Sequence, residues 1–399
     1  MAANRVPAGV VSALGVTQIV GYGTLYYSFS ILAPAMASDL GISLEQVFAI
    51  FSIALFIGGL SAPFIGRHMD RIGAASVMTL GSALAALTLA ACAWSPSVAI
   101  FALTIVLMEV FSGMVQYQAA FATLVESQPR TASRSITYLT LVAGFASTIF
   151  WPIAAMLTAY LSWRQIYVVF AVLNLTVCMP LHYWIKRSGK KDDQQNRIGN
   201  GNAVPGALAP EARRRGIVLV SFAFSLTGFT VASILAHMVP MLGAIGLGGA
   251  AVAIGALFGP AQVLSRLINM VFGQRLSPPA LAITSASFIV LGVIVLGLSG
   301  DWLPGAVAFA ICLGLGSGIN SIAQGSLPLY LFGSAGYGAI TGKMAGARLA
   351  TGAAAPFLFA AAMDRIGTTL SLFVISMIGV LGIIAFMAVA ASVRDKSAI

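Results

Sequence analysis

Charged side chains are scarce in this 399-residue chain: Asp, Glu, Lys and Arg make up only 8% of it, whereas hydrophobic residues make up 59%. A water-soluble domain normally carries about 25% charged residues. Because so few charges cannot cover a soluble globule of this length, a large soluble catalytic domain is excluded. The apolar residues run on for about twenty positions instead of alternating with polar ones, which also excludes an outer-membrane β-barrel. The chain is therefore expected to be an integral membrane protein built from helices.

Residues that bind metals or nucleotides are equally scarce. The three cysteines, Cys92, Cys178 and Cys312, fall in apolar stretches without CxxC spacing, which favours small buried side chains over a metal site. The chain has no G-x-x-x-x-G-K-[ST] loop, no H-E-x-x-H and no nucleophile elbow. We therefore expect no cofactor, no metal, no drive by ATP and no enzymatic activity.

Twelve apolar segments are long enough to cross a hydrocarbon core of about 30 Å. The predicted fold is an all-α membrane protein with twelve transmembrane helices in two pseudo-symmetric six-helix bundles. The predicted spans cover about residues 10–35, 44–65, 76–95, 98–122, 135–160, 165–186, 216–242, 250–272, 279–299, 303–330, 338–362 and 368–391.

One long polar stretch, from Lys186 to Arg215, divides the chain after six spans. Its Gly, Pro, Asn and Gln content and its mixed charge are typical of a flexible linker. We predict an N-terminal bundle over 1–186, a cytoplasmic linker over 187–215 and a C-terminal bundle over 216–399. The basic residues suit contact with anionic lipid heads of the bilayer, and no motif indicates a nucleic-acid partner.

The distribution of positive charge indicates the orientation. With the amino terminus in the cytoplasm, sixteen of the 21 Lys and Arg fall in cytoplasmic segments. Only Arg164 and Arg365 fall outside, and Arg266, Lys343 and Arg348 lie within spans. This bias follows the positive-inside rule. We expect a multi-pass protein of the inner (plasma) membrane, with both termini cytoplasmic and acting as a monomer.

The loop after the second predicted span reads Gly66-Arg67-His68-Met69-Asp70-Arg71-Ile72-Gly73. Its G-x-x-x-D-R-x-G spacing resembles the signature loop of the major facilitator superfamily, a family of secondary transporters, and Ser162-Trp163-Arg164 is similar to the W-R frequent in that family after span five. Residues 21–30 and Tyr337-Gly338 look like the bacterial monocarboxylate and oxalate/formate branch. The resemblance implies the major facilitator fold and transport of a small molecule.

Three features depart from the family pattern. Ala74 and Ala75 follow the loop where the family usually has Arg or Lys, and the corresponding loop of the second half, residues 273–276, has no Asp. The string Met-Asp-Arg-Ile-Gly recurs at 363–367, but the predicted topology places that copy outside. We expect it to be a charged turn without a special role.

The loop motif is expected to act as a conformational latch. A carboxylate at a helix end accepts hydrogen bonds from the free N–H groups of a neighbouring helix, and Arg67 and Arg71 can pair with Asp70 or Glu126. The alternative is a solvated loop placed by topology alone. The predicted latch comprises Gly66, Arg67, Asp70, Arg71 and Gly73.

Ionisable side chains at membrane depth are functional candidates because they are costly in lipid. Arg266 lies ~24 Å along its predicted span and Arg348 ~15 Å along its own. A guanidinium presents two parallel donors to a carboxylate, so Arg266 is predicted to hold an anionic substrate. The alternatives are a structural pair with Glu109 or a side chain that reaches toward the cytoplasm. By resemblance to the oxalate/formate branch, Arg348 is a second cation for the same anion.

Glu109 lies ~17 Å along the fourth predicted span, near the membrane midplane. Burial disfavours the charged form of a carboxylate and a nearby arginine favours it, so Glu109 is the proton-coupling candidate. It can equally be a static counter-ion for an arginine, or a substrate ligand.

Polar and aromatic residues within spans complete a candidate substrate site, although each can instead hold helices together. These residues are Tyr26, Tyr27, Gln116, Tyr117, Asn320 and Gln324. Prolines in or at the ends of spans predict kinks, at Pro34, Pro63, Pro152, Pro260, Pro328 and Pro356.

The sequence thus predicts a gradient-driven carrier that moves a small organic anion, resembling a monocarboxylate, by alternating access with ion or proton coupling. The alternative is an exporter of drugs, amino acids or a metalloid on the same fold.

Overall fold

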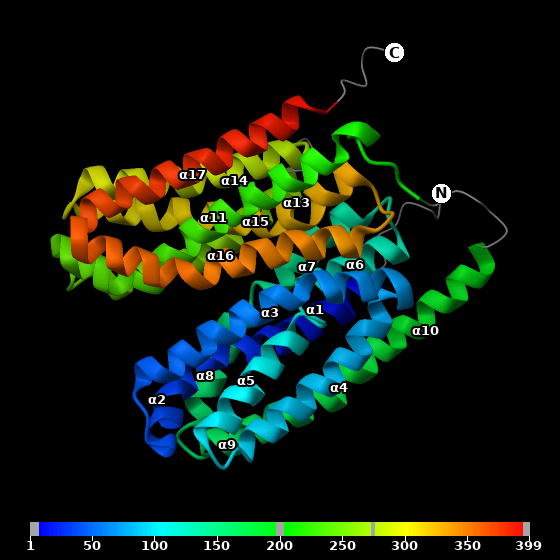
Figure 1. Ribbon diagram of the computed structural model, residues 1–399, viewed down its shortest axis with the longest axis horizontal. Helices are drawn as coiled ribbons and strands as arrows, with labels where there is room; N and C mark the ends of the chain where they lie inside the picture. Colours follow the sequence, from blue (N-terminus) through cyan, green and yellow to red (C-terminus); the bar gives the residue numbers. More distant parts are fainter. Residues whose placement is uncertain (1–7, 197–202, 273–275, 394–399) are drawn as a thin grey trace. The chain divides into compact units, whose positions relative to one another are not determined.

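The computed structural model describes residues 8–196, 203–272 and 276–393, and nearly all of them are helical (Figure 1). Among these described residues, twelve helical segments are long and apolar enough to cross a membrane, which confirms the predicted all-α fold and the span count. These segments are Ala8–Leu40, Leu44–Ile72, Ala74–Ala93, Val98–Ser127, Ala132–Leu157, Trp163–Ser188, Pro210–Leu247, Ala251–Phe272, Pro278–Ser299, Leu303–Phe332, Tyr337–Ile366 and Thr368–Ala391.

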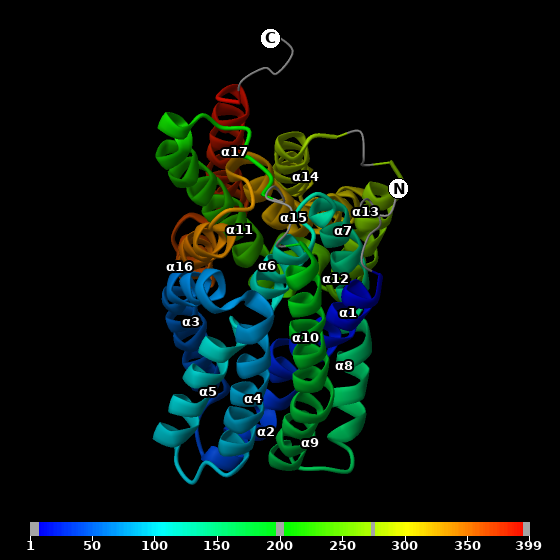
Figure 2. The same cartoon turned by 90° about the vertical axis from the view of Figure 1, so that its right-hand side faces the viewer.

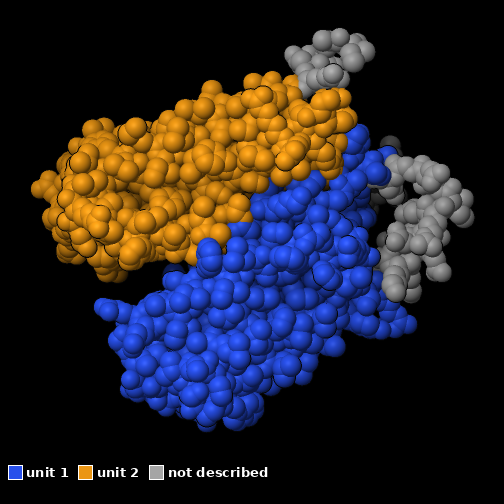
Figure 3. Space-filling view, in the orientation of Figure 1, with its two compact units in different colours: residues 1–205, 334–346 blue, residues 206–333, 347–399 orange. Residues whose placement is uncertain are grey.

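The described residues form two compact units (Figure 3). Unit 1 comprises residues 1–205 and 334–346, and unit 2 comprises residues 206–333 and 347–399. The helix α16 (Tyr337–Ile366) therefore begins in unit 1 and ends in unit 2.

Four of the first six spans in unit 1 are interrupted. The first consists of α1 (Ala8–Tyr22), a π-helical turn at Gly23–Tyr27 and α2 (Ser28–Leu40). The fourth and fifth are broken between two helices each, and the sixth contains a second π-helical turn. Their pieces are α5 (Val98–Ser112), α6 (Tyr117–Ser127), α7 (Ala132–Ala143), α8 (Ala146–Leu157), α9 (Trp163–Leu173), the turn Asn174–Cys178 and α10 (Met179–Asn196).

The second and third spans are the continuous helices α3 (Leu44–Ile72) and α4 (Ala74–Ala93), and α4 lies beside α10 (Figures 1 and 2). Helix α10 extends to Asn196, into the stretch predicted as a flexible linker. Lys and Gln in this stretch are good helix formers, so the preceding helix continues into it.

Unit 2 contains the remaining helices, and α14 packs closely on both α15 and α17. They are α11 (Arg213–Leu242), α12 (Ala251–Ala256), α13 (Phe258–Phe272), α14 (Pro278–Ser299), α15 (Leu303–Phe332) and α17 (Thr368–Ala391).

Glycines bring α15 and α13 together in unit 2. A Cβ added to Gly314 would lie 2.5 Å from the Phe258 carbonyl oxygen, and one added to Gly318 would overlap the Gln262 carbonyl oxygen and the Ser265 hydroxyl. Close approach of backbones through small residues is how helices associate in a membrane, where the hydrophobic effect does not drive them together. This contact places the side chains of α13 directly beside those of α15.

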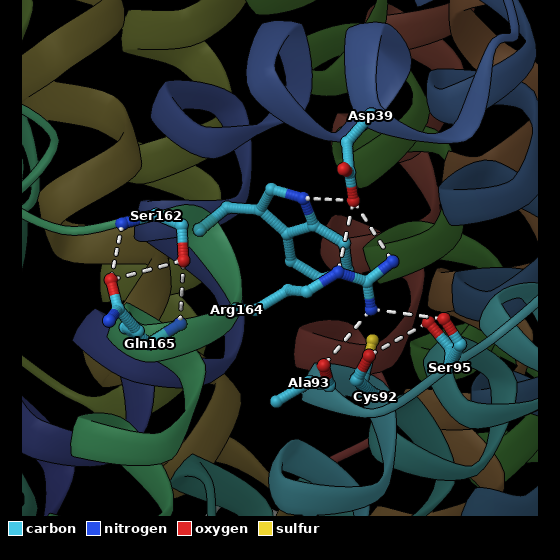
Figure 4. A network of polar contacts seen from close by, with 8 residues as sticks. Asp39, Cys92, Ala93, Ser95, Ser162, Arg164 and Gln165 are labelled. Carbon is cyan, nitrogen blue, oxygen red and sulfur yellow. Dashed lines mark hydrogen bonds and ion pairs between the residues drawn. The ribbon is translucent and has the colours of Figure 1, made fainter.

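One end of unit 1 is tied together by Arg164, at the start of α9 (Figure 4). Its Nε and Nη2 atoms lie 3.0 and 2.9 Å from Asp39 Oδ2, and its Nη1 donates to the carbonyl oxygens of Ala93 and Ser95 at 3.0 Å each. The Trp163 indole N–H donates to the same Asp39 oxygen at 3.0 Å, and the guanidinium lies over the Trp163 ring. The Trp-Arg pair therefore joins the end of α2 and the end of α4 to the start of α9.

Candidate functional site

The carboxylate of Asp70 caps the amino terminus of α16. Its Oδ1 accepts a hydrogen bond from Gly338 N and its Oδ2 accepts one from Ala339 N, both at 2.8 Å. These N–H groups belong to the first turn of α16, where a helix has no carbonyl partners of its own and its dipole favours a negative charge. Within unit 1, the loop after α3 is thus bonded to a helix more than two hundred residues later in the chain.

Glycines allow α3 and α16 to cross by backbone contact at this place. A Cβ on Gly338 would lie 2.7 Å from both Asp70 Oδ1 and the Gly66 carbonyl oxygen, and a Cβ on Gly66 would overlap the Gly338 carbonyl. One turn further along α16, a Cβ on Gly342 would lie 2.6 Å from the Ala62 carbonyl oxygen. Side chains at these positions would separate the two helices and break the Asp70 hydrogen bonds.

The remaining members of the predicted latch have contacts of their own. Gly73 ends α3 with a φ of +87°, a conformation that favours glycine. Glu126 accepts the Ala74 N–H through both carboxylate oxygens, at 3.1 and 2.9 Å, at the start of α4. The Arg67 guanidinium lies 4.5 Å from the centre of the Phe64 ring. Ion pairs of Arg67 and Arg71 with the nearby carboxylates stay predictions.

Aromatic side chains gather around the π-helical turn of the first span, and we call this group the tyrosine cluster: Tyr22, Tyr26, Tyr27, Tyr117 and Trp151. Ring centroids are 5.4 Å apart between Tyr26 and Tyr27 and 4.9 Å apart between Tyr22 and Tyr117. Tyr27 packs edge-on to Trp151, whose indole N–H donates to the Tyr27 carbonyl oxygen. Three residues predicted for the substrate site, Tyr26, Tyr27 and Tyr117, therefore belong to one group in unit 1.

Two glutamines lie at the break in the fourth span, one on α1 and one in the break itself. Gln18 of α1 donates its side-chain N–H to the Val115 carbonyl oxygen at 2.7 Å, so it binds a carbonyl that the broken helix leaves free. Gln116 immediately precedes α6 and has an extended backbone, and its buried Nε2 has no partner within the described residues. Irregular backbone at membrane depth is tolerated only where protein or a wet cavity satisfies it.

Glu109 lies one turn before this break and is 6% exposed. Its backbone packs against Gly58 of α3, where an added Cβ would lie 3.1 Å from the Glu109 carbonyl oxygen. Its Oε1 has no hydrogen-bond partner in the part of the chain that the structure describes. Glu109 is thus a buried carboxylate among helices of unit 1.

In unit 2, Arg266 is 4% exposed and faces the polar side of α15. Its Nε donates to Ser321 Oγ at 3.2 Å, and it has a further interaction. Asn320 and Gln324, also predicted for the substrate site, lie on α15 beside Ser321, and Asn320 is buried. The structure therefore brings Arg266 to the helix that carries two of its predicted partners.

Arg348 is half buried and lies in the part of α16 that belongs to unit 2. Its side chain crosses Gly228 of α11, where an added Cβ would lie 2.9 Å from Arg348 Cγ. Because Gly228 has no side chain, the aliphatic part of Arg348 fits against α11 there. Shared binding of one anion by Arg266 and Arg348 stays a prediction.

Several polar residues of these regions were not singled out from the sequence. Tyr22 connects Tyr117 to Tyr27, and Gln18 binds the broken span. Asn269 lies on α13 one turn after Arg266, and Ser317 lies on α15 one turn before Ser321. For Tyr22, Asn269 and Ser317 the signal available in the sequence was a spacing of three or four from Tyr26, Arg266 and Asn320, which places each pair on the same helix face. Gln18 has no such spacing from a chosen residue.

The family whose profile matches the chain is the Major Facilitator Superfamily, over residues 14–356. Comparison with curated protein sequences gives no match. Among solved structures, the human organic anion transporter MFSD10 (TETRAN) is 15% identical with a TM-score of 0.69, and the match covers 95% of this chain and 99% of that chain.

Two further structures are similar. The proton:xylose symporter XylE bound to 6-bromo-6-deoxy-D-glucose is 12% identical with a TM-score of 0.71, covering 94% of this chain and 95% of that chain. The transporter FucP in the outward conformation is 13% identical with a TM-score of 0.67, covering 95% and 98%. At such identities the likeness concerns the fold.

Proposed function

The chain belongs to the Major Facilitator Superfamily, and on this premise we propose that it is a secondary active transporter that moves a small organic anion by alternating access. The observation that carries the proposal is Arg266, a buried cation in a membrane-spanning helix. Such a charge is costly in lipid and marks a binding site or pathway by default.

The chemistry of the Arg266 side chain supports an anionic cargo. Its Nε is bonded to a neutral serine hydroxyl, and guanidinium groups bind carboxylates through parallel donors. The similar human protein is named as an organic anion transporter. We extend the proposal to Arg348 as a second cation for the cargo, and to a site in an inner membrane protein with both termini in the cytoplasm.

Transport of labelled carboxylates into vesicles reconstituted with the purified protein tests the proposal. Arg266→Gln and Arg348→Gln are expected to abolish accumulation, because each removes a positive charge. Arg365→Gln is the matched control, since Arg365 is exposed at the end of α16. Normal transport by both the Arg266 and the Arg348 variants would overturn the anion site.

Glu109 favours a second candidate function, export of drugs, amino acids or a metalloid. A buried carboxylate whose Oε1 has no partner among the described residues suits a proton or a cationic cargo. A thermal-shift screen of carboxylates, neutral solutes and cations at two pH values separates the two candidates, because specific binding raises apparent stability. Stabilisation by carboxylates alone supports the anion carrier, and stabilisation by cations alone supports the exporter.

A further inference from the structure

Helices α13 and α15 carry more polar side chains near Arg266 than the binding of a carboxylate group alone would need. Arg266 and Asn269 are three residues apart on α13, and Ser317, Ser321 and Gln324 follow one another at helical spacing on α15. The hydrogen bond from Arg266 to Ser321 joins the two sets, and the contact through Gly314 and Gly318 holds the helices at backbone distance. The residues therefore line one side of the α13–α15 pair within unit 2.

Three polar atoms on these two helices are buried without a hydrogen-bond partner among the described residues: Asn269 Oδ1 on α13, and Ser317 Oγ and Asn320 Oδ1 on α15. Asn269 is 9% exposed, Ser317 7% and Asn320 7%. A buried polar group without a partner costs free energy, and native proteins contain few of them. Their concentration beside one buried arginine points to a ligand that supplies the missing hydrogen bonds.

Ser317 shows that the missing bonds are not a general property of this helix. Hydroxyls in membrane helices normally bond to a carbonyl of the preceding turn. Ser321 and Ser326 on α15 do so, donating to Gly318 O at 2.7 Å and Ile322 O at 2.9 Å. Ser317 lies on the same helix and does not use this option, so its hydroxyl stays available to another molecule.

We propose that Asn269, Ser317 and Asn320 form a subsite that binds a hydroxyl or amine substituent of the anion held by Arg266. This rests on the proposed function, which it deepens by naming the cargo as a substituted carboxylate. The amide oxygens accept hydrogen bonds from the substituent, and the serine hydroxyl donates to it or accepts from it. An acid without such a group leaves these atoms unpaired and binds more weakly.

Binding of matched acids to the purified full-length protein, measured by titration calorimetry, tests the subsite. Three pairs share a carbon skeleton: propionate with 2-hydroxypropionate or 2-aminopropionate, butyrate with 3-hydroxybutyrate, and succinate with hydroxysuccinate. In at least one pair the substituted acid is expected to bind about tenfold more tightly, the effect of one hydrogen bond.

Two variants locate the preference. Ser317→Ala and Asn269→Leu are expected to reduce the affinity ratio of that pair toward one, through weaker binding of the substituted acid and unchanged binding of its parent. Ser326→Ala is the matched control, because Ser326 is buried on the same helix but bonds to its own helix. It is expected to keep the tenfold ratio. If Asn269→Leu fails to fold, Ser317→Ala alone decides the test.

The outcomes separate this proposal from the proposed function. Equal binding of substituted and parent acids, abolished by Arg266→Gln, would overturn the subsite and leave the anion carrier intact. A preference that survives both Ser317→Ala and Asn269→Leu would also overturn it. If no acid of any pair binds, the proposed function fails and the subsite falls with it.

Discussion

Replacement of Asp70 measures how strongly the loop after α3 holds the start of α16. Its carboxylate accepts two backbone hydrogen bonds of 2.8 Å. Bonds to a charged group contribute about 1.5–3 kcal/mol each when buried, whereas removal of an exposed helix cap costs about 0.5–2 kcal/mol. Because Asp70 is exposed and the bonds are only partly buried, we expect Asp70→Ala to cost about 1–2 kcal/mol. Asp70→Asn should cost roughly half of that, since its amide oxygen still accepts one bond.

The chain supplies a matched control for this experiment. Asp364 lies in a second copy of Met-Asp-Arg-Ile-Gly, and both copies end a helix at a glycine with positive φ. Asp364 is exposed and has no partner in the described part of the chain. In thermal unfolding of the purified protein, Asp70→Ala should lower the midpoint by about 1–2 °C, and Asp364→Ala should leave it unchanged. Equal shifts in both variants would refute the reasoning, because local sequence alone would then explain them.

Three further predictions concern other contacts. Gly342→Val should slow transport and lower thermal stability, because the valine side chain would overlap the backbone of Ala62. Gly352→Val is the control and should change neither transport nor stability, because a Cβ at this position meets open space. Glu109→Gln should retain exchange of labelled cargo between equal pools but lose accumulation driven by a pH gradient, and unchanged accumulation would make Glu109 a static residue. Arg164→Lys should lower the midpoint of thermal unfolding. The planar guanidinium of Arg164 makes four contacts to three acceptor oxygens, which a lysine ammonium cannot reproduce. An unchanged midpoint would contradict this prediction.

The spans were predictable because a membrane imposes a run of apolar residues, and such a run is visible without any knowledge of packing. The interruptions were less predictable. Prolines were the signal used to predict kinks, but the break in the fourth span falls at residues 113–116, which include no proline. Backbone groups there depend on Gln18, nearly a hundred residues earlier, and a contact of that range leaves no local pattern in the sequence.

Asp70 shows how far a motif can be interpreted. Its loop spacing indicated a carboxylate at a helix end, and the physical argument required free N–H groups from a neighbouring helix. The structure supplies those groups from Gly338 and Ala339. The identical pentapeptide at 363–367 has the same glycine cap but no such neighbour among the described residues. The pentapeptide thus determines the local structure, a helix that ends at a glycine. Whether its Asp carboxylate has a hydrogen-bond partner depends on which helix packs beside it.

Three asparagines show that the hydrogen bonds of a buried polar residue, more than its polarity, distinguish a binding-site residue from one that holds helices together. Asn174, Asn269 and Asn320 each lie buried in an apolar span, so the sequence does not distinguish them. The amide of Asn174 donates to Thr24 Oγ1 and to the Phe170 carbonyl oxygen, both at 2.9 Å, and thereby ties the π-helical turns of two spans together. The Oδ1 atoms of Asn269 and Asn320 have no partner in the described residues. Replacing Asn174 should therefore reduce stability without changing which acids bind, whereas replacing Asn269 should change which acids bind.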